Sequence, residues 1–307
     1  MKNFISVIMP THNHAWELYF TLFSLEKQYG IGHNEYEIII VNTNPDDIDT
    51  LDTAKHYHEK FKNIRLIQVY DEKASTIKAA CYGGNLGART YAKGDLLVLV
   101  VDSARIPTPG VLIKTRSEFE KWGENIVTTT VPYHFLKHYS TPGFTVEECR
   151  KAFLKTRWRQ DIYHLFDYAA HTNISKSGIF NESCYLGITK KNFIKVNGYN
   201  EIFTEWSDYN LDLWRRLTRN PPKDGIQIPD EVNDHWGKIG LGLEIHALSG
   251  EADFHLHHSL SDAKRIFSRR LIIDSWNEYG EVGDCIKANI NRPDWGTGKA
   301  EEVKFEE

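Results

Sequence analysis

The 307-residue chain has few cysteines, no excess of basic side chains and no apolar run long enough to cross a membrane. Its four cysteines lie far apart and form no CxxC pair. This argues against a disulfide framework or a zinc site and is typical of reduced thiols in a cytosolic protein. A net charge of −5, from 37 basic and 42 acidic residues, argues against a nucleic-acid-binding face.

The sequence also shows neither a signal peptide nor a membrane-spanning segment. A membrane span needs about 20 apolar residues, and the apolar stretch in the opening MKNFISVIMPTHN is too short for a signal peptide. We therefore expect a cytoplasmic protein without a transmembrane segment, and peripheral contact with a membrane is left open. Apolar residues make up 41% of the chain and charged residues 26%, as in ordinary globular proteins.

The first hundred residues alternate between strand and helix patterns. This alternation predicts βαβ units around a parallel sheet. The helix at 75–92 contains Gly83-Gly84, which predicts either an interruption or a close approach of the backbone to a neighbour. The predicted strands cover residues 4–9, 36–41 and 64–69, and the predicted helices cover 15–28, 48–60 and 75–92.

Six apolar residues, Leu96–Val101, end abruptly on Asp102. Such a run is typical of a strand that is buried on both faces of a parallel sheet. Open sheets of this kind bind ligands at the carboxyl ends of their strands, so Asp102 is expected to face a ligand crevice. Taken alone, an acidic turn at a strand end would be the simpler interpretation.

Several segments, taken in order, resemble the inverting family 2 glycosyltransferases. Their fold, GT-A, is an α/β fold with a Rossmann-like, mixed and mostly parallel sheet flanked by helices. The resemblance covers about residues 4–258. The segments that carry it are Ile5–Asn13, Glu37–Asn42, Asn85–Arg89 with Ala92–Asp95, Val101–Ala104, and Gly187–Phe193 with Val196–Glu201.

The resemblance implies a division of the chain. Residues 1–258 would form the catalytic domain, with a nucleotide-sugar-binding half at 1–110 and an acceptor-binding half at 111–258. Residues 259–307 would add a C-terminal helix and a charged tail. We expect the residues from Glu281 onward to be loosely ordered.

The donor implied by the resemblance is a nucleotide-sugar, with a UDP-sugar favoured. Its base needs polar groups after the first and second strands, and Thr11, Asn13 and Asn42 occupy those places. The family usually has Asp at the position of Asn42, where an amide keeps an acceptor and adds donors; a strand-ending turn is an equal alternative. The full set of predicted donor-binding residues is Pro10, Thr11, Asn13, Asn42, Asn85, Arg89, Asp102 and Arg105.

A divalent metal would balance the pyrophosphate charge. The family holds it with an Asp-x-Asp motif, whose second Asp is replaced here by Ala104. Asp102 with His255 and His257, two imidazoles that share one face of a strand, would suit Mn²⁺ or Mg²⁺. The alternatives are a His-rich strand end without metal, or partial replacement of the cation by Arg105.

Inversion at the anomeric carbon requires one general base. The acid expected from the family falls on Asn210, so Asp208, at the predicted start of a helix, is the candidate catalytic base. An acid that caps the helix is an equal alternative. Asp212 is predicted to pair with Arg215 or Arg216 along the same helix.

The leading hypothesis is a metal-assisted, inverting glycosyltransferase that moves a sugar to an acceptor hydroxyl on a glycan or another small molecule. A second hypothesis is a nucleotide-binding module that has lost catalysis, because Asn42, Ala104 and Asn210 each replace an acid of the family. A third and weaker hypothesis is a metal-dependent hydrolase built on His255 and His257. The sequence lacks the additional closely spaced carboxylates that such a site would need.

Overall fold

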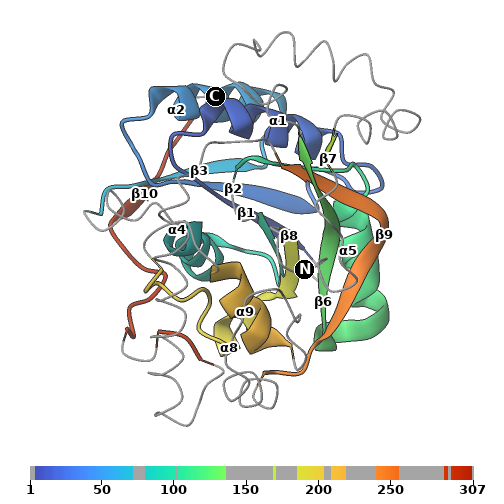
Figure 1. The fold of residues 1–307 in the computed structure, drawn as a ribbon. Coiled ribbons are helices and arrows are strands. Elements are labelled where there is room, and N and C mark those ends of the chain that lie inside the picture. Colours follow the sequence, from blue (N-terminus) through green and yellow to red (C-terminus); the bar gives the residue numbers. More distant parts are fainter. Residues whose placement is uncertain are drawn as a thin grey trace.

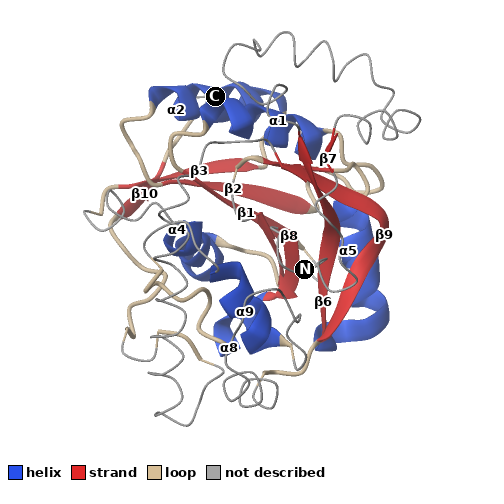
Figure 2. Ribbon diagram, viewed as in Figure 1, coloured by secondary structure: helices blue, strands red, loops and turns tan. Residues whose placement is uncertain are grey.

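The computed structural model describes residues 4–71, 80–100, 103–135, 169–170, 185–203, 209–218, 240–255, 287–289 and 292–305. Within these residues a ten-stranded sheet runs through the molecule, with helices packed on both of its faces (Figures 1 and 2). The strand order is β10-β3-β2-β1-β4-β8-β6-β9-β5, and β7 pairs with β6 outside this path. The α/β fold class predicted from the sequence is confirmed.

The amino-terminal half contains the predicted strand and helix alternation. β1, β2, β3 and β4 lie side by side and are parallel. Every residue of β1 and β2 is buried, because both faces of these strands are covered. The elements are β1 (Ile5–Thr11), α1 (Ala15–Glu26), β2 (Tyr36–Asn42), α2 (Ile48–Lys60), β3 (Ile64–Val69) and β4 (Leu96–Val100).

Alternate residues of the central strands belong to two separate cores. Val7 and Met9 of β1 pack in a cluster with residues of α1 and α2, whereas Ile8 packs in a second cluster with residues of α4 (Ala80–Leu86). This period of two follows from the pleat of a strand, which sends successive side chains to opposite faces. The parallel centre of the sheet is therefore buried between two helical layers.

The α4 helix continues through Gly83-Gly84 and passes into a π-helical turn, Gly87–Tyr91, so the predicted interruption is wrong. The glycines instead allow close approach. A Cβ atom on Gly83 would lie 2.9 Å from Cβ of Pro10, and one on Gly87 would lie 2.6 Å from Cγ2 of Ile8. Both distances are shorter than real Cβ contacts, so the helix lies on β1 at a depth that side chains would prevent.

The second half of the sheet is mixed. β8 is antiparallel to β4, β6 is antiparallel to β8, β9 is parallel to β6, and β5 is antiparallel to β9. Helix α5 covers this side of the sheet. The elements are β5 (Arg105–Pro107), α5 (Val111–Trp122), a 3₁₀ turn (Gly123–Asn125), β6 (Ile126–Phe135), β7 (Ala169–Ala170), β8 (Tyr185–Thr189), α8 (Lys190–Lys195), α9 (Tyr209–Leu217) and β9 (Glu244–His255).

The C-terminal residues 292–305 pack against the domain, so the loose ordering predicted for them is wrong. β10 (Ala300–Glu302) is antiparallel to β3 and adds an edge strand. The side chain of Trp295 is buried. Main-chain groups at a sheet edge need partners, and this segment supplies them to β3. The predicted C-terminal helix at 259–279 lies outside the described residues.

Candidate functional site

Polar loops follow the carboxyl ends of β1 and β2, which are adjacent in the sheet. Thr11 and Asn42 are register partners at these ends. The backbone N–H of Thr43 donates to the carbonyl oxygen of Thr11 at 3.0 Å, and Nδ1 of His12 lies 2.9 Å from Oγ1 of Thr43. These contacts hold the two loops against each other, as a shared ligand-binding edge requires.

Asn13 adopts a left-handed backbone conformation, with φ of 59°. Asparagine is among the few residues with a side chain that tolerate this region. Its Oδ1 accepts a hydrogen bond of 2.5 Å from Nδ2 of Asn44 in the neighbouring loop. The conformation thus turns the Asn13 amide toward the β2 loop rather than away from it.

A row of buried polar side chains crosses the ends of the first three strands. Thr11, Asn42 and Gln68 are successive register partners on β1, β2 and β3, and each is at most 5% exposed. Oδ1 of Asn42 accepts a hydrogen bond of 3.0 Å from the backbone N–H of Asn44. Among the described residues, Nδ2 of Asn42 and Oε1 of Gln68 have no hydrogen-bond partner.

Asp102 lies outside the described residues, and its neighbour Ser103 is held at the same edge. Oγ of Ser103 donates to Oγ1 of Thr11 at 3.1 Å, and its carbonyl oxygen accepts a hydrogen bond of 2.6 Å from Thr21. The chain that leaves β4 therefore passes beside the end of β1.

Arg105 is buried and forms an ion pair with Asp253. Nη1 of Arg105 lies 3.1 Å from Oδ2 of Asp253, and both side chains are at most 3% exposed. The other carboxylate oxygen of Asp253 accepts a hydrogen bond of 2.6 Å from Thr130. The charge of Arg105 is thus balanced within the protein, which weakens its candidacy as a substitute for a metal cation.

The predicted metal ligands are only partly within the described residues. The backbone of His255 is the register partner of Arg105, which brings the end of β9 next to the chain that follows Asp102. His257 lies outside the described residues. Those residues contain no group of three His, Cys, Asp or Glu side chains that could hold a metal ion, so any such site must include residues beyond them.

Asn85 and Arg89, predicted at the donor, contact other parts of the protein. Asn85 accepts from the backbone N–H of Tyr199 at 2.7 Å and donates to Oε1 of Glu201 at 3.0 Å. The guanidinium of Arg89 lies over the Trp295 ring, 4.6 Å from its centroid. Their donor role stays a prediction, and these contacts do not favour it.

The region predicted to bind the acceptor includes α9. Asp208 precedes this helix and lies outside the described residues, so the predicted base is not placed. Asp212 is fully buried and receives hydrogen bonds of 3.0 and 2.7 Å from Nε and Nη2 of Arg216. The predicted structural pair is therefore confirmed with Arg216 as the partner.

One buried acid, Glu201, was not recognised as such from the sequence. It lies in the loop before α9, and its Oε1 accepts hydrogen bonds from Asn85 and from the backbone N–H of Gly296 at 2.8 Å. Burial raises the pKa of its carboxyl group, while these hydrogen bonds lower it. No signal in the segment Gly198–Ile202 marks the acid as buried, because its partners come from distant parts of the chain.

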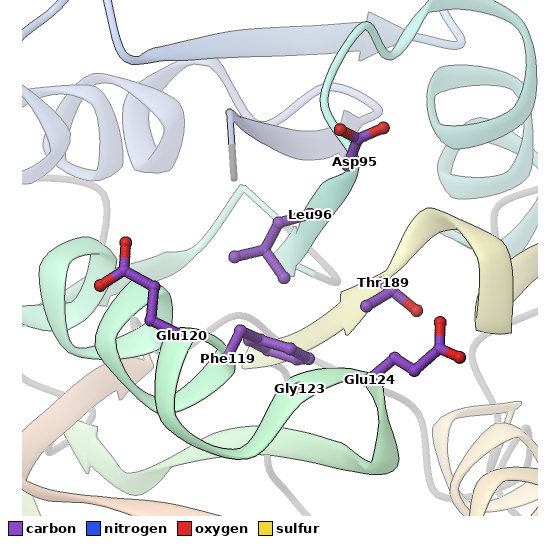
Figure 3. Close-up of a pocket in the computed structure, with 7 residues that line it drawn as sticks. All are labelled: Asp95, Leu96, Phe119, Glu120, Gly123, Glu124 and Thr189. Carbon is purple, nitrogen blue, oxygen red and sulfur yellow. The ribbon is translucent and has the colours of Figure 1, made fainter. Parts of the chain in front are cut away.

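A pocket of about 620 Å³ lies at the opposite edge of the sheet (Figure 3). Leu96 is the first residue of β4 and Thr189 the last of the antiparallel β8, so the pocket is at the amino ends of the parallel strands. Its lining includes three acidic residues. The pocket is therefore distinct from the polar loops after β1 and β2, which lie at the carboxyl ends of the parallel strands. The lining residues are Asp95, Leu96, Phe119, Glu120, Gly123, Glu124 and Thr189.

Comparison with known proteins identifies a family. Residues 6–184, more than half of the chain, match the family model described as glycosyl transferase family 2. No curated protein matches the chain. Among the described residues, no helix is long and apolar enough to cross a membrane.

Several solved structures share the fold. TarS 1–349 of S. aureus has a TM-score of 0.50 and 17% identity, over 83% of this chain and 60% of that one. The same protein in complex with UDP-GlcNAc has a TM-score of 0.51 and 16% identity, over 86% and 61%. The mannosyltransferase PcManGT from Pyrobaculum calidifontis, in complex with GDP-Man and Mn²⁺, has a TM-score of 0.50 and 10% identity, over 92% and 64%. The chain thus spans less than two thirds of these proteins, and the likeness shows the fold.

Proposed function

Because the chain belongs to glycosyl transferase family 2, we propose that it transfers a sugar from a UDP-sugar to an acceptor hydroxyl with inversion, assisted by a divalent metal. The observation that supports this most is the convergence of polar groups at one sheet edge. Thr11, Asn42 and the Ser103 hydroxyl follow β1, β2 and β4, and Ser103 and Thr11 are hydrogen-bonded to each other. Open α/β sheets bind ligands at this edge.

In this proposal the nucleotide occupies the edge formed by residues 1–110. Asn13 and Asn42 would contact the base or ribose, and Pro10 and Thr11 would form the floor beneath them. Asn13 lies in the loop after β1 and Asn42 ends β2, and the loops after these strands contact each other through the Asn13–Asn44 hydrogen bond. A site assembled before the ligand arrives loses less conformational entropy on binding.

Asp102, with His255 and His257, would hold the metal. A carboxylate and two imidazoles suit Mn²⁺ or Mg²⁺, and the ion would balance the charge of the pyrophosphate when bound. The pairing of β5 with β9 supports this set, because it places the backbone of His255 opposite Arg105. Asp253 is left out of this set, since its two oxygens already contact Arg105 and Thr130.

The proton of the acceptor hydroxyl would pass to Asp208. Inversion is a single displacement in which the hydroxyl oxygen attacks the anomeric carbon and the nucleoside diphosphate leaves, so one base is sufficient. Asp208 is the carboxylate directly before α9, whereas Asp212 on the same helix is committed to Arg216. This leaves Asp208 as the better candidate.

A panel of nucleotide-sugars tests the proposal. The release of UDP, GDP and CMP is measured for the full chain, with and without Mn²⁺, and UDP release that depends on Mn²⁺ and on Asp102 is expected. Asn13→Ala and Asn42→Ala should weaken UDP binding in calorimetry, whereas Asn34→Ala, an exposed residue before β2, should not.

The other outcomes are also informative. Full turnover in excess EDTA would remove the metal from the proposal. Binding of UDP without cleavage of any donor would favour a nucleotide-binding module, the alternative motivated by Asn42, Ala104 and Asn210. Equal UDP affinity in all three Asn variants would contradict the placement of the nucleotide.

A further inference from the structure

A hydrogen-bond donor and an acceptor without partners lie next to each other at the ends of β2 and β3. Asn42 and Gln68 are register partners on these parallel strands, and their side chains are 0% and 5% exposed. Among the described residues, neither Nδ2 of Asn42 nor Oε1 of Gln68 has a partner. Buried polar groups in folded proteins are nearly always paired, so these two atoms indicate a site that a ligand or water completes.

Both side chains lie on the same face of the sheet. Register partners of a parallel pair point the same way, and Ile40 and Leu66, two residues earlier on each strand, belong to the same core cluster. Thr11, the partner of Asn42 on β1, continues the row. The two unpartnered atoms therefore come from side chains that are neighbours across one strand pair, at the edge proposed for the nucleotide.

The orientation of the Asn42 amide is fixed by chemistry. The backbone N–H of Asn44 donates to its Oδ1 at 3.0 Å. A backbone N–H has no lone pair and can only donate, so the oxygen of Asn42 must face Asn44 and its nitrogen must face away. Reversing the amide would leave two donors facing each other.

This arrangement can pair with a nucleobase edge that offers an acceptor beside a donor. An acceptor on the base would take the Asn42 donor, and an adjacent donor on the base would take the Gln68 acceptor. Cytosine offers N3 and its N4 amine in this order, and uracil offers O4 and N3–H. We infer that Asn42 and Gln68 contact the base and admit cytosine nucleotides as well as uracil nucleotides, an inference that rests on the proposed function.

An isosteric substitution reverses the polarity at Asn42. In Asn42→Asp the carboxylate still accepts from Asn44, but it presents only acceptors to the base. Uracil can shift and offer N3–H to that carboxylate, whereas N3 of cytosine carries a lone pair that the carboxylate repels. Gln68→Met, which has a similar volume, removes the side-chain amide that both bases would contact.

Calorimetry of UDP and CDP with the full chain in the presence of Mn²⁺ tests the inference. For the unaltered protein we expect the two dissociation constants to agree within tenfold. Asn42→Asp should weaken CDP at least tenfold more than UDP, and Gln68→Met should weaken both nucleotides at least fivefold. Folding of each variant is checked by circular dichroism, and Gln68→Met decides if Asn42→Asp does not fold.

The failures are distinguishable. A preference of the unaltered protein for UDP by more than tenfold overturns the inference and leaves the proposed function standing. The same holds for an unchanged UDP-to-CDP ratio in folded Asn42→Asp, or for unchanged affinities in Gln68→Met. If the unaltered protein binds neither nucleotide, the proposed function fails and the inference fails with it.

Discussion

At the scale of single residues, the environment of a carboxylate separates structural acids from candidate catalytic ones. Asp212 and Asp253 each face a buried arginine, at 2.7 and 3.1 Å. Each pair holds its carboxylate against a buried guanidinium, and removing one partner of a buried pair costs about 3–5 kcal/mol. We therefore assign structural roles to Asp212 and Asp253, and Asp208 remains the candidate base.

Asp208→Asn is expected to lower kcat by roughly 10²–10⁴ while leaving the dissociation constant for UDP unchanged. A general base acts on the reaction barrier and not on nucleotide binding, and asparagine keeps the ability to cap a helix. Steady-state kinetics and calorimetry together check this. Glu205→Gln is the matched control, and a loss of kcat there but not in Asp208→Asn would reassign the base.

Glu201 makes a prediction about pH. Burial raises the pKa of its carboxyl group above the usual value, so between the unfolded and folded pKa values the folded state binds more protons. Stability then falls as pH rises through this range. Glu201→Gln keeps an acceptor for Asn85 and Gly296 but does not ionise. Melting temperatures measured from pH 4 to 8 should show the unaltered protein losing stability relative to the variant as pH rises; parallel curves would contradict this.

At the scale of elements, glycines let α4 and the π-helical turn after it pack closely against β1 and β2. Gly83 contacts Pro10 and Gly87 contacts Ile8 without any intervening side chain. Pro10 immediately precedes Thr11, so the position of α4 and the position of the donor loop are linked. A substitution in the helix should therefore affect both stability and nucleotide binding.

Gly87→Ala is expected to destabilise the protein by about 1–3 kcal/mol through overpacking, because the new methyl group would lie 2.6 Å from Cγ2 of Ile8. Urea unfolding measures this change. Ser117→Ala on the exposed face of α5 should change stability by no more than about 0.5 kcal/mol. A gain in stability for Gly87→Ala would show that the helix can move away from β1.

At the scale of the whole molecule, the C-terminal segment joins regions that are distant in sequence. The backbone N–H of Ala288 donates to the carbonyl oxygen of Val196, Arg292 donates to the carbonyl oxygen of Glu201, and β10 pairs with β3. Trp295 lies between them, buried and in contact with Arg89. The segment thus connects the loop before α9 to the edge strand β3.

Trp295→Ala should cost about 3–5 kcal/mol, as truncation of a buried tryptophan does, and should reduce cooperativity between the two halves. Urea unfolding followed by circular dichroism measures the loss. Glu301→Ala, on the exposed side of β10, is the control and should be close to neutral. If Trp295→Ala were as stable as the control, residues 292–305 would not contribute to the stability of the domain through Trp295.

The sequence alone determined the α/β class, the parallel centre of the sheet and the pairing of Asp212 with an arginine on its own helix. These depend on local periodicity, because burial imposes a period of two on a strand and about 3.6 on a helix. It also located Thr11, Asn13 and Asn42 at strand ends, since apolar runs stop where the chain leaves the sheet.

Only the tertiary structure decided which groups meet. The pairing of Arg105 with Asp253, the burial of Glu201 by Asn85 and Gly296, and the docking of residues 292–305 each join positions about 90 or more residues apart. Sequence periodicity carries no record of such partners. The free donor of Asn42 likewise depends on where the β2 loop places the N–H of Asn44, because that contact fixes which end of the amide faces the ligand.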